Sequence, residues 1–262
     1  MGLCDSLFFQ PSRRIYEEPP AYGLRYRNIE LAVGPGDRLH GWFFEAQRPA
    51  RALVVHCHGN AGNITGHFPF IAWMPEAGIH VLAFDYRGYG RSTGAPSRGN
   101  VVEDGLAATR LGLQLAGERR VPVVLFGQSL GGAVAVSAAV REPRVAGVVL
   151  DSAFSSYRRE AAWVARQSLL LWPAWRLFGR WLISDGPDPV GEIGCISPRP
   201  VLIMHGKHDR IVDWRQSVEL YEAAGEPKDL WLIDDCDHCQ IWGTWLPEAK
   251  RRFLRLLDYL PH

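Results

Sequence analysis

A serine between two glycines stands at a position that suits a nucleophile. The segment Gly127-Gln128-Ser129-Leu130-Gly131 follows the apolar run 121–126 and precedes a run compatible with a helix. A sharp turn from strand to helix crowds the backbone, so the residues two before and two after the serine must lack side chains. This context predicts that Ser129 is presented as a nucleophile at the carboxyl end of a strand. An ordinary glycine-rich start of a helix is the alternative interpretation.

The nucleophile requires a general base, and the base requires an acid, because a serine hydroxyl reacts weakly near neutral pH. Asp209 follows the apolar run 200–205 and His238 follows the run 230–233, in the chain order serine, aspartate, histidine. We expect His238 to take the proton of Ser129 and Asp209 to orient the imidazole. Other carboxylates near strand ends stay open as the acid: Asp151, Asp213, Asp234, Asp235 and Asp237.

Two loops are candidates for the oxyanion hole, which needs two fixed backbone N–H donors for the tetrahedral intermediate. We expect one donor from Leu130, the residue after the nucleophile. The other is expected from Asn60 in the loop His58-Gly59-Asn60-Ala61-Gly62-Asn63, where a glycine before the donor lets the backbone approach the substrate. Other histidines near these motifs are interpreted as structural hydrogen-bonding residues: His56, His58, His205 and His208.

The elements that must position these residues alternate between strands and helices. The runs 25–33 and 38–46 flank a turn-rich segment and predict a β-hairpin. Amphipathic stretches predict helices, one of them capped by Asn100 with Glu103 completing a capping box, and another at the C-terminus. The nearly continuous apolar runs suit a mostly parallel sheet with helices on both faces, which is an α/β fold. These runs are 52–57, 80–84, 122–126, 145–150, 200–205 and 230–233.

Residues 155–198 interrupt this alternation, since they hold no convincing strand and are rich in tryptophan. We interpret them as a helical insertion within a single domain of residues 1–262 and expect them to cap a pocket. Extra packing and membrane contact are the alternatives, although Arg159, Trp163 and Arg166 share one helical stripe, which argues against a membrane-facing surface. Three aromatic residues are expected to line an apolar acyl pocket: Phe154, Trp163 and Trp172.

Composition excludes several classes of protein. The chain has 262 residues, 47% hydrophobic and 22% charged, as expected for a globular domain. Its 29 basic and 28 acidic side chains leave a net charge of +1, which gives no field to attract nucleic acid. Five cysteines, an odd number in a long chain, predict a reducing, cytoplasmic compartment. The start of the chain fits an N-myristoylation pattern at Gly2 with Cys4 as a second acylation site, so N-terminal acylation is one route to membrane contact.

The pair Cys236 and Cys239 flanks the candidate base at a spacing that also occurs in zinc and redox sites. A structural zinc ion needs four ligands, and a second such pair is missing, so we expect no metal. A local disulfide beside His238 is the remaining alternative.

The chain resembles the α/β-hydrolase superfamily from about residue 25 to its C-terminus. Within it, the chain is similar to the serine hydrolases that include the fission-yeast polarity-type hydrolases and the eukaryotic protein depalmitoylases. This resemblance implies that Ser129, Asp209 and His238 are catalytic and that no cofactor is used. The depalmitoylases carry a cysteine-rich N-terminal segment, whereas this chain has only Cys4 there. The motifs that carry the resemblance are the segments 58–63, 85–92, 127–132, 205–209 and 237–238.

These observations predict a serine hydrolase that cleaves carboxylic esters or thioesters through an acyl-enzyme, with a small-molecule or acyl ester as substrate. A peptidase of the same fold is one alternative, for which Arg158, Arg159 and Glu160 offer charged groups to hold a substrate terminus. A ligand receptor that has kept the hydrolase pocket is another.

Overall fold

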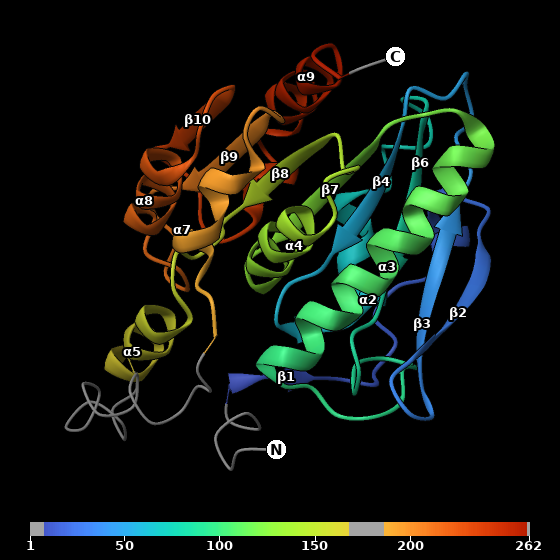
Figure 1. The fold of residues 1–262 in the computed structure, drawn as a ribbon, viewed down its shortest axis with the longest axis horizontal. Helices are drawn as coiled ribbons and strands as arrows, with labels where there is room; N and C mark the ends of the chain where they lie inside the picture. The colour runs from blue at the N-terminus through green and yellow to red at the C-terminus, as the bar shows by residue number, and fades with distance from the viewer. Residues whose placement is uncertain (1–7, 168–185, 261–262) are drawn as a thin grey trace.

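Eight strands form a twisted sheet in the computed structural model, which describes residues 8–167 and 186–260. Their order is β10-β9-β8-β7-β4-β6-β3-β2 (Figure 1). The strands from β10 to β6 run parallel, while β3 is antiparallel to β6 and β2 is antiparallel to β3. The mostly parallel sheet predicted from the apolar runs is therefore confirmed. The strands are β2 (Arg27–Val33), β3 (Asp37–Phe44), β4 (Ala52–Cys57), β6 (Ile79–Phe84), β7 (Val123–Gln128), β8 (Gly147–Asp151), β9 (Val201–Gly206) and β10 (Lys228–Ile233).

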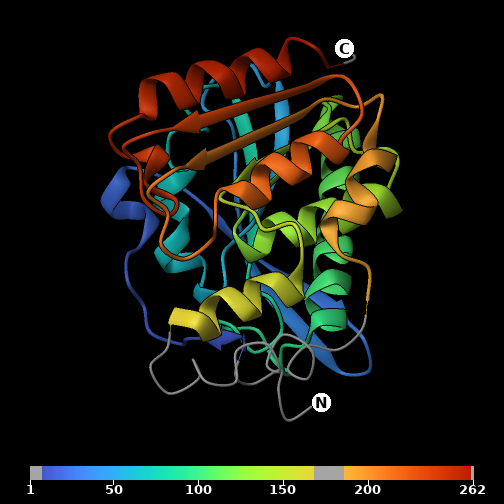
Figure 2. The same cartoon turned by 90° about the vertical axis from the view of Figure 1, so that its left-hand side faces the viewer.

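Helices cover both faces of this sheet. Figure 1 shows α3 (Arg98–Arg119) and α4 (Leu130–Arg141) in front of the central strands. In Figure 2, β9 and β10 run between α9 (Leu246–Leu257) on one side and α8 (Arg215–Ala223) on the other. The other helical elements are η1 (Pro19–Tyr22), α2 (Ile64–His67), η2 (Phe68–Phe70), α5 (Tyr157–Gln167), α7 (Pro189–Glu192), η4 (Ile193–Ile196) and η5 (Gln240–Trp242).

Two apolar cores lie on the two faces of the sheet, and the central strands contribute side chains to both of them. Leu53 and Val55 of β4 belong to the core under α3 and α4. Val54, between them, belongs to the core on the other face, together with Phe253 of α9. Because side chains alternate across a strand, a strand covered on both faces is apolar at most positions, and in β4 the one exception, His56, is paired with Gln128 Oε1 at 2.9 Å.

The start of α3 differs from the prediction. Ser97, and not Asn100, is the N-cap, since its backbone is extended and its Oγ accepts a hydrogen bond from the Asn100 N–H at 3.1 Å. Asn100 is the third residue of the helix, and its side chain donates instead to the Ala95 carbonyl. The helix thus begins one turn earlier than expected, because serine offers the same capping oxygen directly after Pro96.

The predicted insertion is helical where the structure describes it. α5 follows β8, and α7 and η4 precede β9. Asp188 joins the two parts of the insertion, because its carboxylate accepts hydrogen bonds from Ser156 Oγ at 2.7 Å and from the Tyr157 N–H at 3.1 Å. Residues 168–185, which include Trp172, lie outside the described part of the chain. Within that part, every helix is too short or too polar to cross a membrane.

A second, very small sheet was not predicted. β1 (Gln10–Pro11) pairs in parallel with β5 (Ala61–Gly62), so the N-terminal segment lies against the loop that follows β4. In Figures 1 and 2, β1 lies at the same edge of the molecule as α5. This is also the edge where the carboxyl ends of β4, β7 and β9 meet, so elements from distant parts of the sequence gather there.

Candidate active site

Ser129 occupies a strained turn between β7 and α4. Its backbone has φ 52° and ψ −116°, a conformation that residues with side chains rarely adopt. A Cβ on Gly127 would lie 2.3 Å from the Gly131 carbonyl oxygen, and one on Gly131 would lie 1.9 Å from the Cys57 carbonyl oxygen. The predicted need for glycine at both positions is therefore confirmed, and Gly131 allows α4 to begin directly against the end of β4.

His238 and Asp209 are brought together by the loops after β10 and β9. His238 Nδ1 lies 2.7 Å from Asp209 Oδ2. The other carboxylate oxygen, Oδ1, accepts hydrogen bonds from the N–H groups of Ile211 and Val212, each at 2.8 Å. Burial alone raises the pKa of Asp209. Hydrogen bonds from His205 and His238 lower this pKa by more than burial raises it, so the net pKa is depressed and Asp209 is ionised near neutral pH.

His205 is a member of this network that the sequence analysis interpreted only as structural. Its Nε2 lies 2.9 Å from Asp209 Oδ2, and its Nδ1 lies 2.6 Å from Ser217 Oγ of α8. The side chain is completely buried. The only sign of this role in the sequence was the position of His205 four residues before Asp209. That spacing did not show that His205 and His238 bind the same carboxylate oxygen, Asp209 Oδ2.

Ser129 and His238 converge on two consecutive residues of one strand end. The Ser129 N–H donates to the Asp151 carbonyl oxygen at 2.9 Å, and the Cys239 N–H donates to Ser152 Oγ at 3.2 Å. Within the described residues, no hydrogen bond joins the side chains of Ser129 and His238 directly. Such contacts are often long before substrate binds and tighten in the complex. The structure thus joins the Ser129 turn and the loop that carries His238 to the same strand end, through Asp151 and Ser152.

The alternative acid Asp151 has other partners. Its carboxylate accepts hydrogen bonds from Gln128 Nε2, Trp242 Nε1 and Ser152 Oγ, and none from His238. Burial raises the pKa of Asp151, in contrast to the lowered pKa of Asp209. Asp237 accepts a hydrogen bond from the backbone N–H of His238 rather than from its ring. The contacts therefore favour Asp209 as the acid. The remaining candidates pair with basic side chains at the surface: Asp213 with Arg215, Asp234 with Lys207, and Asp235 with His208.

The protonation of His238 is set by opposing effects. Burial alone lowers its pKa, but the neighbouring Cys239 thiol and the Asp209 carboxylate act in the other direction, and the net pKa lies well above its ordinary value of 6.5. Burial raises the pKa of Cys239 to about 11, so this thiol is uncharged near neutral pH. The Asp209 carboxylate is consequently the group that stabilises the His238 imidazolium.

The loop after β4 approaches the nucleophile closely. A Cβ on Gly59 would lie 3.7 Å from both Ser129 Cβ and the Gln128 carbonyl oxygen. Within the described residues, neither the Asn60 N–H nor the Leu130 N–H has a hydrogen-bond acceptor. An oxyanion needs two such unpaired amides, and these two belong to the residue after Gly59 and the residue after Ser129.

The expected substrate-binding aromatics are placed differently from one another. Phe154 is fully buried, and its ring packs against Tyr157 with centroids 4.9 Å apart and against Phe8 at 6.5 Å. Trp163 of α5 is half-buried, and its Nε1 has no hydrogen-bond acceptor within the described residues. The structure brings Phe154 to the edge of the site as part of the core, together with Phe8, which the sequence analysis missed.

A buried carboxyl group of α5 belongs to Glu160, one of the charged residues that the sequence offered for holding a substrate terminus. Glu160 is 4% exposed, and its Oε2 accepts a hydrogen bond from Gln216 Nε2 at 3.0 Å. Burial raises its pKa to about 8. The hydrogen bond from Gln216 and the charge of His238 oppose this rise, and the charge of Asp209 adds to it. α5 therefore presents a carboxyl group to the surroundings of His238.

The cysteines beside His238 are both free thiols. Cys236 Sγ lies 3.5 Å from the Asp237 carbonyl oxygen, and Cys239 directly follows His238 in the chain. Among residues 8–167 and 186–260, no group of three or more histidine, cysteine or carboxylate side chains is arranged to hold a metal ion. His56 and His58 bind neighbouring protein groups, Gln128 Oε1 and the Gly59 carbonyl oxygen.

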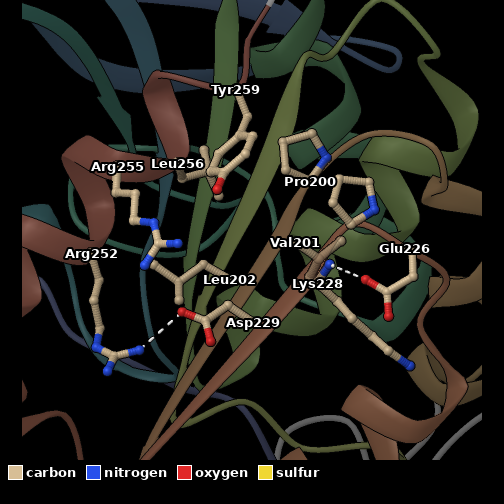
Figure 3. Close-up of a pocket in the computed structure, with 11 residues that line it drawn as sticks. Pro200, Val201, Leu202, Glu226, Lys228, Asp229, Arg252, Arg255, Leu256 and Tyr259 are labelled. Atoms are coloured by element: carbon tan, nitrogen blue, oxygen red, sulfur yellow. Dashed lines mark hydrogen bonds and ion pairs between the residues drawn. The ribbon is translucent and has the colours of Figure 1, made fainter.

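A separate pocket of about 410 Å³ lies at the opposite edge of the sheet (Figure 3). It is lined by the amino ends of β9 and β10 and by Arg252, Arg255 and Tyr259 at the end of the chain. Arg252 pairs with Asp229 at 2.9 Å. Because Ser129 follows the carboxyl end of a parallel strand, this pocket is not part of the candidate active site.

Known proteins resemble this chain in sequence and in fold. A family model described as serine aminopeptidase, S33 matches residues 48–192. The Escherichia coli K12 protein YfhR, which is called uncharacterized, is 35% identical over 97% of this chain and 86% of its own length. Protein bem46 of Schizosaccharomyces pombe is 29% identical over 85% of this chain and 74% of its own length. The Pyrococcus furiosus esterase Pf2001 superposes with a TM-score of 0.80 at 20% identity, covering 97% of this chain and 98% of Pf2001.

The sheet order, the strained serine turn and these similarities define the α/β-hydrolase class. Within this class, the chain belongs to the serine aminopeptidase, S33 family. The resemblance to the fission-yeast polarity-type hydrolases that its motifs indicated is confirmed by the match to bem46.

Proposed function

We propose that this hydrolase cleaves carboxylic esters or thioesters through an acyl-enzyme formed on Ser129. The observation that carries the proposal is the 2.7 Å contact between His238 Nδ1 and Asp209 Oδ2, in loops that meet the Ser129 turn at Asp151 and Ser152. An ionised acid that holds one imidazole nitrogen leaves the other, Nε2, to accept a proton. The esterase Pf2001 has the same fold, which supports this class of reaction.

The proposed reaction has two halves that share the same base. Ser129 Oγ attacks the carbonyl carbon while His238 Nε2 accepts the hydroxyl proton, and the Asn60 and Leu130 N–H groups stabilise the negative oxygen that forms. The C–O or C–S bond then breaks, and His238 returns the proton to the leaving alcohol or thiol. A water molecule, deprotonated by His238, attacks the acyl-enzyme and releases the carboxylic acid and free Ser129.

We place the acyl group beside α5 and the rest of the insertion 155–198, which would act as a cap. The aromatic cluster of the half-buried Phe8 and the buried Phe154 and Tyr157 supports this placement, because it gathers apolar side chains at the edge of the sheet where α5 begins. Apolar surface there favours an acyl chain over a charged substituent.

Hydrolysis of p-nitrophenyl esters from acetyl to palmitoyl tests this function, with the wild type measured beside Ser129→Ala. We expect turnover in the wild type and a loss of more than about 10³-fold in the variant, because the covalent route is removed. A thioester with the best acyl group then separates esterase from thioesterase activity. Equal rates in a folded Ser129→Ala protein would overturn the proposal.

A second candidate is an aminopeptidase or aminoacyl esterase, and Glu160 is the observation that favours it. A buried carboxyl group near His238 would become a charged partner when a substrate ammonium group arrives, and the description of the matching family points the same way. The test compares aminoacyl esters and amides that carry a free amino group with the same compounds after N-acetylation. A preference for the free amine that disappears in Glu160→Gln supports this candidate, whereas equal rates exclude it.

A further inference from the structure

The N-terminal segment of residues 8–16, here called the N-terminal strap, crosses the loop that follows β4. Besides the β1–β5 pairing, the Ser12 N–H donates to the Gly62 carbonyl oxygen at 3.0 Å. Phe9 is 4% exposed and belongs to the core under α3 and α4, so the strap is fixed to the domain at its start. The strap is therefore an integral part of the catalytic edge rather than a loose terminus.

The side chain of Asn60 binds the strap in both directions. Its Nδ2 donates to the Phe8 carbonyl oxygen at 2.5 Å, and its Oδ1 accepts from the Gln10 N–H at 3.3 Å. The Tyr89 hydroxyl donates to the same Oδ1 at 2.8 Å. Three contacts fix the side chain of Asn60, whose backbone N–H has no acceptor within the described residues and which follows Gly59, the residue that approaches Ser129.

The second asparagine of the loop repeats this arrangement. Asn63 Nδ2 donates to the carbonyl oxygens of Ser12 and Arg14, each at 2.8 Å, while Oδ1 caps α2 by accepting from the Thr65 N–H at 2.9 Å. The Tyr16 ring lies over Gly62 of this loop and Gly66 of α2, since a Cβ on these glycines would be 3.6 Å and 3.3 Å from the ring. The strap thus covers the loop and the start of α2, from Asn60 to Gly66.

The strap also connects this loop with the insertion. The Phe8 ring lies 6.5 Å from the Phe154 ring and 6.1 Å from the Tyr157 ring, measured between centroids. Tyr157 is the first residue of α5. Both views of the fold place β1 and α5 at the same edge (Figures 1 and 2).

We propose that the N-terminal strap positions the Asn60 N–H as an oxyanion donor, with the Asn60 and Asn63 side chains as the positioning groups. The inference rests on the proposed ester hydrolysis and adds a control element to the same site. A loop that contains Gly59 and Gly62 has little stiffness of its own, yet an oxyanion donor acts only when it is held in place before the reaction. The hydrogen bonds to the strap supply that restraint.

The first experiment compares Asn60→Ala with the wild type, because this change keeps the backbone N–H and removes all three side-chain contacts. We expect kcat for a p-nitrophenyl ester to fall about tenfold to 100-fold, with KM changed less than about twofold, since the donor acts mainly in the transition state. Asn28→Ala is the matched control, because it also removes an asparagine side-chain hydrogen bond, here to His40 on β3, far from Ser129. Unchanged kcat in Asn60→Ala would overturn the inference.

The second experiment ties the effect to the strap itself. Gln10→Pro removes the N–H that binds Asn60, whereas Gln10→Ala keeps it, so only the proline variant should lose kcat. In an Asn60→Ala background the proline change should have little further effect, because its partner is already missing. Additive losses in the double variant would show that strap and loop act independently, and would overturn the inference.

Asn63→Asp keeps the inference testable if Gln10→Pro does not fold. Aspartate retains the oxygen that caps α2 but cannot donate to the Ser12 and Arg14 carbonyl oxygens. We expect a fall in kcat at a melting temperature close to that of the wild type, and an unchanged kcat would count against the strap. Failure of the proposed function is distinguishable, because the wild type itself would then show no Ser129-dependent turnover.

Discussion

Replacing Asp209 with asparagine tests the assignment of the acid more sharply than any other change. Asp209 Oδ1 accepts two backbone N–H groups, and Oδ2 accepts from two histidines. If the asparagine oxygen keeps the two backbone donors, its NH₂ group must face His205 and His238. Each ring must then offer a nitrogen without hydrogen, which moves the His238 proton to Nε2, the nitrogen that should accept from Ser129.

The expected magnitude follows from this change of tautomer. A base in the wrong tautomer cannot take the serine proton, so we expect kcat to fall by about 10³-fold to 10⁴-fold, equivalent to about 4 to 5.5 kcal/mol in the barrier. His205 can adapt, because a hydrogen on its Nδ1 would point to Ser217 Oγ, which is able to accept it, although the 3.2 Å contact of its Nε2 with the Val212 carbonyl oxygen is then lost as a hydrogen bond. The fold should therefore persist in Asp209→Asn.

The assay is p-nitrophenyl ester hydrolysis with thermal unfolding measured on the same preparations, and Asp151→Asn is the matched control. Asp151 is equally buried at a neighbouring strand end but binds Gln128, Trp242 and Ser152 instead of His238. Its replacement should change kcat less than about tenfold. The opposite ranking of the two variants, with both folded, would refute the assignment.

Three further predictions follow from the charges and the close contacts. The pKa of His238 is raised and its protonated ring cannot act as a base, so kcat/KM should fall as the pH drops, with a midpoint above 6.5; a midpoint below 6 would contradict this. Gly131→Ala should destabilise the fold by about 3 kcal/mol or more in urea unfolding, because its Cβ would meet the Cys57 carbonyl oxygen, whereas Gly117→Ala, with nothing within 4 Å, should stabilise it by about 0.5 to 1 kcal/mol. Burial raises the pKa of Glu160 to about 8 from 4.5, so this group stabilises the fold most below pH 4.5 and loses that contribution as the pH rises to 8; Glu160→Gln should flatten the dependence of the unfolding free energy on pH in this window.

Most of the sheet could be predicted because the central strands β4, β6, β7, β8 and β9 are buried on both faces, whereas β10 is only partly buried. The run 52–57 coincides with β4, and the other runs match their strands within about three residues, since continuous burial leaves a continuous apolar signal. β1 and β5 leave no such signal, because two residues each are too few to form a pattern. The contact between the strap and the oxyanion loop therefore became visible only in three dimensions.

The sequence could predict which residues of the site follow the ends of strands. It could not predict the hydrogen bonds that connect their side chains. Spacing favoured Asp209 and left Asp151, at the end of another strand, open as the acid, and the contacts of the two side chains separate them. The capping error at Asn100 has a similar cause, since Ser97 offers an equivalent oxygen three residues earlier. Likewise, the sequence marked Asn60 for its backbone and gave no sign that its side chain binds Phe8 and Gln10.

The end of β8 gives the nucleophile and the base a common reference point. Asp151 accepts from the amide of Ser129, and Ser152, at φ 53°, accepts from the amide beside His238. Thermal displacement of this strand end moves both reacting groups together, so their separation varies less than the position of either one. A substitution that displaces the end of β8 is therefore expected to shift the amides of Ser129 and Cys239 together.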